Sequence, residues 1–161
     1  CWNHCHMPLT KTHVHSFTIM NLVGDAFHNL LDGLVIAASY LVSIPLGITT
    51  TLAVVLHEIP QEISDFGILL HGGFSRKKAL LINFATALTA VLGAVIGLLL
   101  SGFIDGIEFF LIPIAAGGFI YIAGSDLIPE LHKEFNLKKS IWQLIVFILG
   151  ILVMAGLLFL E

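Results

Sequence analysis

Two clusters of acidic, amide and imidazole side chains stand out because each lies within a long run of apolar residues. The clusters consist of Asp25, His28, Asn29 and Asp32, and of His57, Glu58, Gln61, Glu62 and Asp65. Imidazole together with carboxylate and amide oxygens suits a borderline divalent ion such as zinc, iron or manganese. A cage of oxygens alone would instead suit calcium or magnesium. These residue types therefore predict a site for a divalent transition metal.

Helical spacing places the donors of each cluster on a shared face. Residues three or four positions apart lie on the same side of an α-helix, so the first cluster forms one polar stripe. In the second cluster His57, Gln61 and Asp65 form a stripe, with the two glutamates beside it. The short turn centred on Ile44, before Pro45, makes the two helices antiparallel neighbours. Equal distances from this turn predict that both stripes lie at one depth, near the midpoint of the helices.

The elements that carry these clusters are predicted to lie in a lipid bilayer. Apolar residues make up 57% of the 161 residues and charged residues only 11%, whereas a soluble globular domain carries about 25% charged residues. A spanning helix needs about 20 mostly apolar residues, and five runs qualify. They cover residues 17–42, 46–70, 79–103, 109–127 and 141–160. The sequence thus predicts an all-α membrane protein, a five-helix bundle over residues 17–161 that follows a His/Cys-rich segment at residues 1–16.

The acidic side chains of the first two spans have no compensating base, because no Lys or Arg lies inside any predicted span. A carboxylate near the bilayer centre costs roughly 2.5–3.5 kcal/mol. Five unpaired carboxylates would cost on the order of 12–18 kcal/mol, which exceeds the stability of a typical protein. A bound cation or protons must neutralise them. We favour a metal, and pairing between the helices or a proton-carrying chain of these groups stay as alternatives.

The positive charges indicate the orientation. All seven fall on one side of the predicted helices, and they are Lys11, Arg76, Lys77, Lys78, Lys133, Lys138 and Lys139. The positive-inside rule makes that side cytoplasmic, with the C-terminus outside, in the plasma or inner membrane. No basic stripe of the kind that binds nucleic acid is present in the sequence.

The first 16 residues hold a tract of metal-binding residue types. Its members are Cys1, His4, Cys5, His6, His13 and His15. A metal-gathering cytoplasmic loop has this composition, and so does a tail that binds nothing specific. The role of the tract is left open.

Both clusters resemble motifs of the ZIP (Zrt/Irt-like) family of metal transporters. Residues 24–33, GDAFHNLLDG, resemble the fourth-helix motif, in which an HN pair is followed by a carboxylate and glycine. Residues 57–66, HEIPQEISDF, resemble the fifth-helix motif HEIPHELGDF, and residues 125–132, SDLIPELH, resemble the end of the seventh helix. The HEIPQE variant looks more like prokaryotic members. The similarity runs from the loop after helix three through helix eight of an eight-helix fold.

The resemblance implies a binuclear metal site and import of metal into the cytoplasm. Its implied ligands are His28, Asn29, Asp32, His57, Glu58 and Gln61. Gln61 stands where the eukaryotic motif has His, and a neutral amide is the weaker ligand. Zn²⁺ is the expected transported substrate, with Fe²⁺, Mn²⁺ and Cd²⁺ left open. The implied partners are the lipid bilayer and the three missing N-terminal helices of the same protein, and a homodimer stays open.

The predicted function is therefore transmembrane transport of a divalent metal, with zinc favoured, and not an enzymatic reaction. An intramembrane zinc metalloprotease is one alternative, because His57-Glu58 begins an HExxH-like run. Gln61 removes the second histidine of that motif, and Pro60 would bend the helix that must present both ligands. A metal sensor that does not transport is the other alternative.

Overall fold

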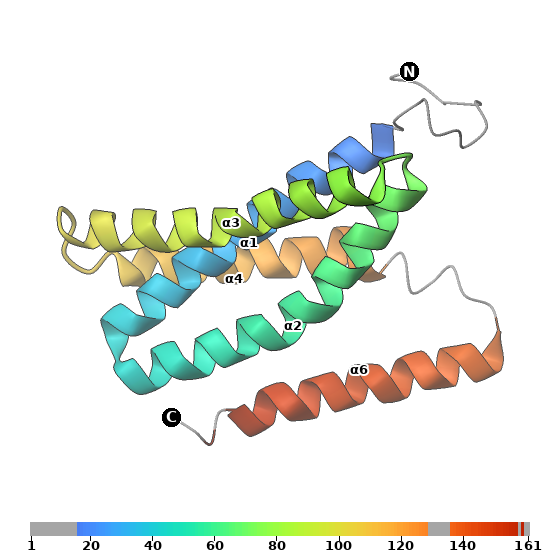
Figure 1. Ribbon diagram of the computed structural model, residues 1–161. Coiled ribbons are helices and arrows are strands. Elements are labelled where there is room, and N and C mark those ends of the chain that lie inside the picture. Colours follow the sequence, from blue (N-terminus) through green and yellow to red (C-terminus); the bar gives the residue numbers. More distant parts are fainter. Residues whose placement is uncertain (1–15, 129–135, 158, 160–161) are drawn as a thin grey trace.

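The structure is a computed structural model that describes residues 16–128, 136–157 and 159, and every regular element in these ranges is a helix (Figure 1). The elements are α1 (Ser16–Val42), α2 (Ile44–His71), α3 (Arg76–Ser101), α4 (Glu108–Ile122), the π-helical turn η1 (Ala123–Leu127) and α6 (Leu137–Leu157). The all-α fold is confirmed. Helix ends differ from the predicted spans by a few residues: α6 begins at Leu137, and α4 ends at Ile122, with η1 covering the rest of the predicted span to Leu127. The Cys1–His15 tract lies outside the described residues.

Short capped turns join α1 to α2 and α2 to α3. Ser43 precedes α2, and its hydroxyl oxygen accepts a hydrogen bond from the Leu46 backbone N–H at 3.2 Å. Ser75 does the same for the Lys78 backbone N–H at 3.4 Å. Both serines satisfy an N–H group that has no partner within its own helix. Only Ser43 separates the end of α1 at Val42 from the start of α2 at Ile44. So short a connection makes the two helices neighbours that run in opposite directions, as predicted.

α1 is the central helix, because it contacts α2, α3 and α4 and packs most extensively against α3. Glycines permit this close approach. A methyl group on Gly33 would overlap the carbonyl oxygen of Ala90, and one on Gly93 would overlap that of Leu30. Small residues at the contact of two membrane helices allow their backbones to approach in this way. α1 and α3 thus form the most closely packed pair of helices in the described bundle.

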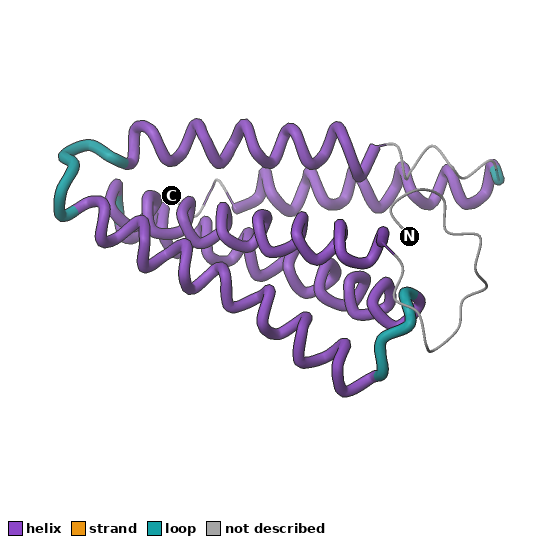
Figure 2. Tube along the Cα trace, turned by 90° about the horizontal axis from the view of Figure 1, so that it is seen from above, coloured by secondary structure: helices purple, strands orange, loops and turns teal. Residues whose placement is uncertain are grey.

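α2 and α6 lie toward the outside of the bundle. Figure 1 shows that α2 bends along its length. α2 contains Pro60 in its interior, and a proline there removes a helical hydrogen bond and bends the helix. α6 contacts only α2 to a notable extent and has no buried residue. Seen from above, the helices run along one another and the loops lie at the two ends (Figure 2).

Three of the described helical segments are long and apolar enough to cross a membrane: Arg76–Ser101, Glu108–Ser125 and Leu137–Leu157. α1 and α2 have 27 and 28 residues, which is also sufficient length for a span. They differ from the other three because they carry the two polar clusters. The described bundle therefore combines three apolar helical segments of membrane-spanning length with two helices, α1 and α2, that each have a polar face.

We expect Gly33→Leu to lower the free energy of unfolding by about 1–3 kcal/mol, the usual cost of overpacking a tight contact. The measurement is an unfolding titration with a denaturing detergent. Gly24→Leu is the matched control on the same helix, because a Cβ added at Gly24 meets no other atom within 4 Å. Equal loss of stability in both variants would contradict the close α1–α3 contact.

Candidate metal centre

Four side chains from α1 and α2 converge at the middle of the bundle. His28 and Asp32 lie one turn apart on α1, and His57 and Glu58 are neighbours on α2; one ligand atom from each lies within 4.8 Å of all the others. The Nε2 atoms of the two histidines are 3.4 Å apart. Asp32 Oδ2 lies 3.3 Å from His57 Nε2, and Glu58 Oε1 lies 3.5 Å from His28 Nε2. We name this group the mixed centre, because it offers two nitrogens and two oxygens.

The mixed centre is withdrawn from the surface. The side chain of Asp32 is fully buried, those of His28 and Glu58 are 11% and 16% exposed, and that of His57 is 39% exposed. His57 Nδ1 lies 3.0 Å from the carbonyl oxygen of Ala53. A carbonyl only accepts, so Nδ1 carries a proton, and Nε2 is the nitrogen with which His57 would bind a metal at the centre. The α2 backbone thus orients this imidazole as a ligand.

Several atoms of the mixed centre have no hydrogen-bond partner. They are Asp32 Oδ1, Glu58 Oε1 and His28 Nδ1. α1 and α2 contain no Lys or Arg, so neither helix supplies a base to the two carboxylates. Buried acceptors without a partner are unfavourable unless a cation or protons offset them. Two imidazole nitrogens and two carboxylate oxygens fit zinc or a similar divalent ion.

Two of the six expected ligands make their hydrogen bonds beside the mixed centre. Asn29 is 1% exposed, and its amide donates to Asp25 Oδ1 at 2.9 Å. The amide of Gln61 donates to the same oxygen at 3.4 Å. Asp25 lies one turn from His28 and Asn29 on α1. The expected ligand set therefore divides into four residues that converge and two whose amides hold Asp25.

Phe119 on α4 is a part of the site that the sequence did not indicate. Its ring centroid lies 5.4 Å from that of His28 and 6.5 Å from that of His57, in edge-to-face geometry. Gly118 lets α4 approach, because a methyl group there would overlap Leu31 Cδ1. The Gly117-Gly118 pair was the available signal. Phe119 thus closes the mixed centre from a third helix.

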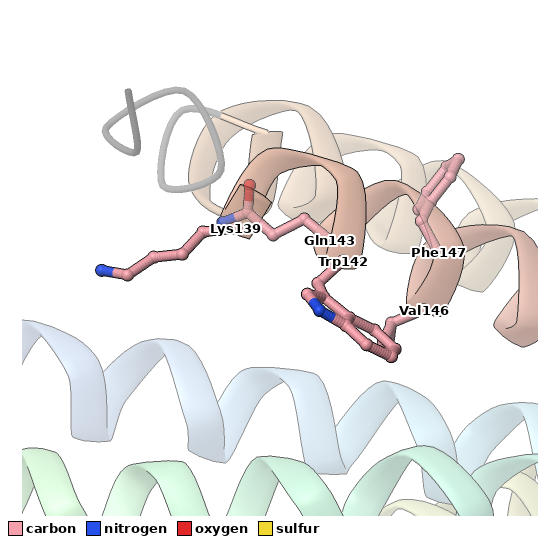
Figure 3. Close-up of a pocket in the computed structure, with 5 residues that line it drawn as sticks. All are labelled: Lys139, Trp142, Gln143, Val146 and Phe147. Atoms are coloured by element: carbon pink, nitrogen blue, oxygen red, sulfur yellow. The ribbon is translucent and has the colours of Figure 1, made fainter. Parts of the chain in front are cut away.

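A hollow of about 480 Å³ lies next to the mixed centre. Glu58 and Asn29 line it together with Glu62, Ile59 and Ala90, which places it between α2, α1 and α3. A second hollow of about 480 Å³ lies along α6, and Figure 3 shows its lining side chains, all from that one helix: Lys139, Trp142, Gln143, Val146 and Phe147. These five include no acid and no imidazole, so only the first hollow adjoins metal-binding groups.

The described helices include three that are apolar and long enough to cross a membrane, and nitrogen and oxygen donors lie between the other two, α1 and α2. These features define the class of integral membrane proteins with a candidate metal site. The comparison with known families is more specific. The model of the family described as ZIP zinc transporter matches residues 5–158. The chain belongs to this family, which confirms the resemblance of the motifs.

The chain is similar to three animal proteins whose names describe them as zinc transporters. It is 41% identical to zinc transporter zipt-7.2 of Caenorhabditis elegans over 84% of this chain and 30% of that protein. It is 42% identical to the zinc transporter ZIP13 homolog of Drosophila melanogaster over 84% of this chain and 39% of that protein. It is 38% identical to zinc transporter SLC39A7 of Homo sapiens over 88% of this chain and 32% of that protein. The chain thus spans about a third of these relatives. The similarity of residues 57–62, HEIPQE, to prokaryotic members of the family stays a prediction.

No solved structure gives a significant match to this chain.

Phe119→Ala should weaken zinc binding about 10-fold, the lower end of the effect of removing a group that orients metal ligands. Both imidazoles would lose the ring against which they rest, while all four donors remain. Competition with a chromophoric zinc chelator measures the affinity. Phe109→Ala is the control on α4, because Phe109 is 76% exposed. Unchanged affinity in the Phe119 variant would show that the ring does not position the histidines.

Proposed function

We propose that this chain is the metal-carrying part of a transporter that moves a divalent metal ion, with zinc favoured, across a membrane. The observation that carries the proposal is the mixed centre, formed by one histidine and one acid from each of two neighbouring helices. Membership of the ZIP zinc transporter family and the names of the relatives support zinc as the substrate. Because the chain spans about a third of those relatives, the activity is proposed for a longer protein.

The mixed centre can exchange the hydration shell of a divalent ion for protein ligands. The ion would offset the charge of Asp32 and Glu58, and the two imidazoles would favour zinc over calcium and magnesium. Each helix supplies half of the donors, so a small separation of α1 from α2 would release the ion. Transport needs binding that is strong enough for entry and weak enough for exit. A site divided between two helices satisfies both requirements.

The finer features of the transport path are proposals. We assign six ligands to a binuclear site, and they are His28, Asn29, Asp32, His57, Glu58 and Gln61. The positive-inside rule supports a cytoplasmic side at Arg76–Lys78 and Lys138–Lys139. Metal would then move into the cytoplasm across the plasma or inner membrane. Three preceding helices of a longer protein, or a second copy, would complete the path.

Proteolysis is the weaker explanation of the same residues. A metalloprotease helix of the HExxH type presents two histidines to one zinc ion. Here Gln61 takes the place of the second histidine, and its amide donates to Asp25. The family and the relatives also favour transport over an enzymatic reaction.

The test of the site is a count of bound metal in the purified full-length protein. We expect about one to two zinc ions per chain in the unmodified protein and a loss of at least one in a His28→Ala/His57→Ala variant. His71→Ala is the control, because His71 lies at the end of α2 and outside the mixed centre. Equal zinc content in all three proteins would contradict the assignment of the ligands.

Asp32→Asn should reduce zinc uptake at least 10-fold, because it removes the charge of the most buried ligand while preserving its size. Uptake is measured with ⁶⁵Zn in cells that produce equal surface amounts of each protein. Asp105→Asn is the control, since this residue is exposed in the loop between α3 and α4. Zinc binding without uptake in the unmodified protein would favour a sensor over a transporter.

A further inference from the structure

A buried amide of α3 holds an acidic side chain of α2 that lies next to the mixed centre. Asn83 is 7% exposed, and its Nδ2 atom donates to the backbone carbonyl oxygen of Glu62 at 3.1 Å and also to Glu62 Oε2. Both of these oxygens only accept, so the nitrogen of the amide must face them. Asn83 thus ties the backbone and the carboxylate of Glu62 to α3.

Glu62 is close to the ligands of the mixed centre but is not one of them. It lies one helical turn beyond Glu58, and residues four positions apart share a face of a helix. Both glutamates and Asn29 line the hollow of about 480 Å³. The four residues whose ligand atoms converge do not include Glu62. A third carboxylate therefore lies beside the mixed centre and is hydrogen-bonded to α3 instead.

The direction of the Glu62 carboxylate depends on Asn83. α3 lines the hollow with Ala87 and Ala90, whose side chains carry no hydrogen-bond donor. Glu62 Oε1 is buried and has no hydrogen-bond partner. Loss of the Asn83 amide would therefore leave Glu62 without the α3 donor that directs it away from Glu58.

The oxygen of the Asn83 amide indicates a role beyond packing. Asn83 Oδ1 is buried without a hydrogen-bond partner, which lowers the stability of the fold. An apolar side chain fills the corresponding place one turn earlier on α3, where Ala79 is fully buried. The two hydrogen bonds to Glu62 are what the asparagine adds.

We propose that Asn83 is a specificity-determining residue, because it keeps the Glu62 carboxylate out of the mixed centre. This inference rests on the proposed function. The charges of Asp32 and Glu58 match that of one divalent ion, and the two imidazoles favour zinc. A third carboxylate would add a negative charge and another oxygen donor, and oxygen-rich sites suit harder ions such as Mn²⁺. Holding Glu62 against α3 therefore preserves the preference for zinc.

The test compares the affinities of the full-length protein in detergent for zinc and for Mn²⁺, each by competition with a fluorescent chelator. We expect Asn83→Ala to narrow the preference for zinc about 10-fold, the order of one hydrogen bond to a charged group, with Mn²⁺ bound more tightly. Asn83→Ala/Glu62→Gln should restore the preference, because no third carboxylate remains. Thr86→Ala is the matched control on α3, since the Thr86 hydroxyl donates to a carbonyl oxygen of its own helix.

The second substitution separates a loss of positioning from a loss of fold. A damaged protein would bind both metals more weakly and would not be rescued by Glu62→Gln, and that result would overturn the proposal, as would an unchanged preference in Asn83→Ala.

Glu62→Gln alone keeps an oxygen that can accept from Asn83, so the preference for zinc should stay as in the unmodified protein. Weaker zinc binding in this variant would show that Glu62 is already a ligand, and the proposal would fail even if Asn83→Ala does not fold. Zinc binding that persists in His28→Ala/His57→Ala would instead refute the proposed function.

Discussion

The arrangement of the bundle depends on one constraint, which is that α1 and α2 bring buried carboxylates together without a base of their own. Asp32 is fully buried, and Asp25 and Asp65 are nearly so. Such charges are tolerated inside a membrane protein only when protons, a partner or a cation offset them. The polar residues of α1 and α2 are therefore a constraint on how these two helices pack. Their facing polar stripes determine which sides must meet and which sides are left for lipid or for other helices.

The remaining elements hold these stripes in register. α3 approaches α1 at Gly33 and Gly93, which leaves no room for sliding between the two backbones. From α3, Asn83 donates to Glu62, and Thr89 donates to the Ala26 carbonyl oxygen at 2.8 Å. α4 contributes the aromatic edge of Phe119 through a contact that Gly118 permits. α6 is different, because it has no buried residue. The mixed centre is thus supported by four helices, although only two supply its donors.

Much of this could be predicted from the sequence, because the signals are local. Apolar runs of about 20 residues and the turn before Pro45 predicted the helices, and i, i+3 and i, i+4 spacing predicted the polar faces. The convergence of His28 and Asp32 with His57 and Glu58 followed from the short turn between their helices. The sequence could not show that the amides of Asn29 and Gln61 turn toward Asp25, since spacing does not specify side-chain rotamers. Phe119 was missed because it is one of 12 phenylalanines and comes from a helix far along the chain.

The most direct test of the account is the X-ray absorption spectrum of zinc bound to the purified full-length protein at the zinc edge. The account predicts a first shell of nitrogen and oxygen at about 2.0–2.1 Å, with the outer-shell scattering of two imidazoles. This result would place zinc between α1 and α2, because His28 and His57 come from different helices. A shell that contains sulfur, or one of oxygen without imidazole scattering, would contradict the mixed centre as the zinc site.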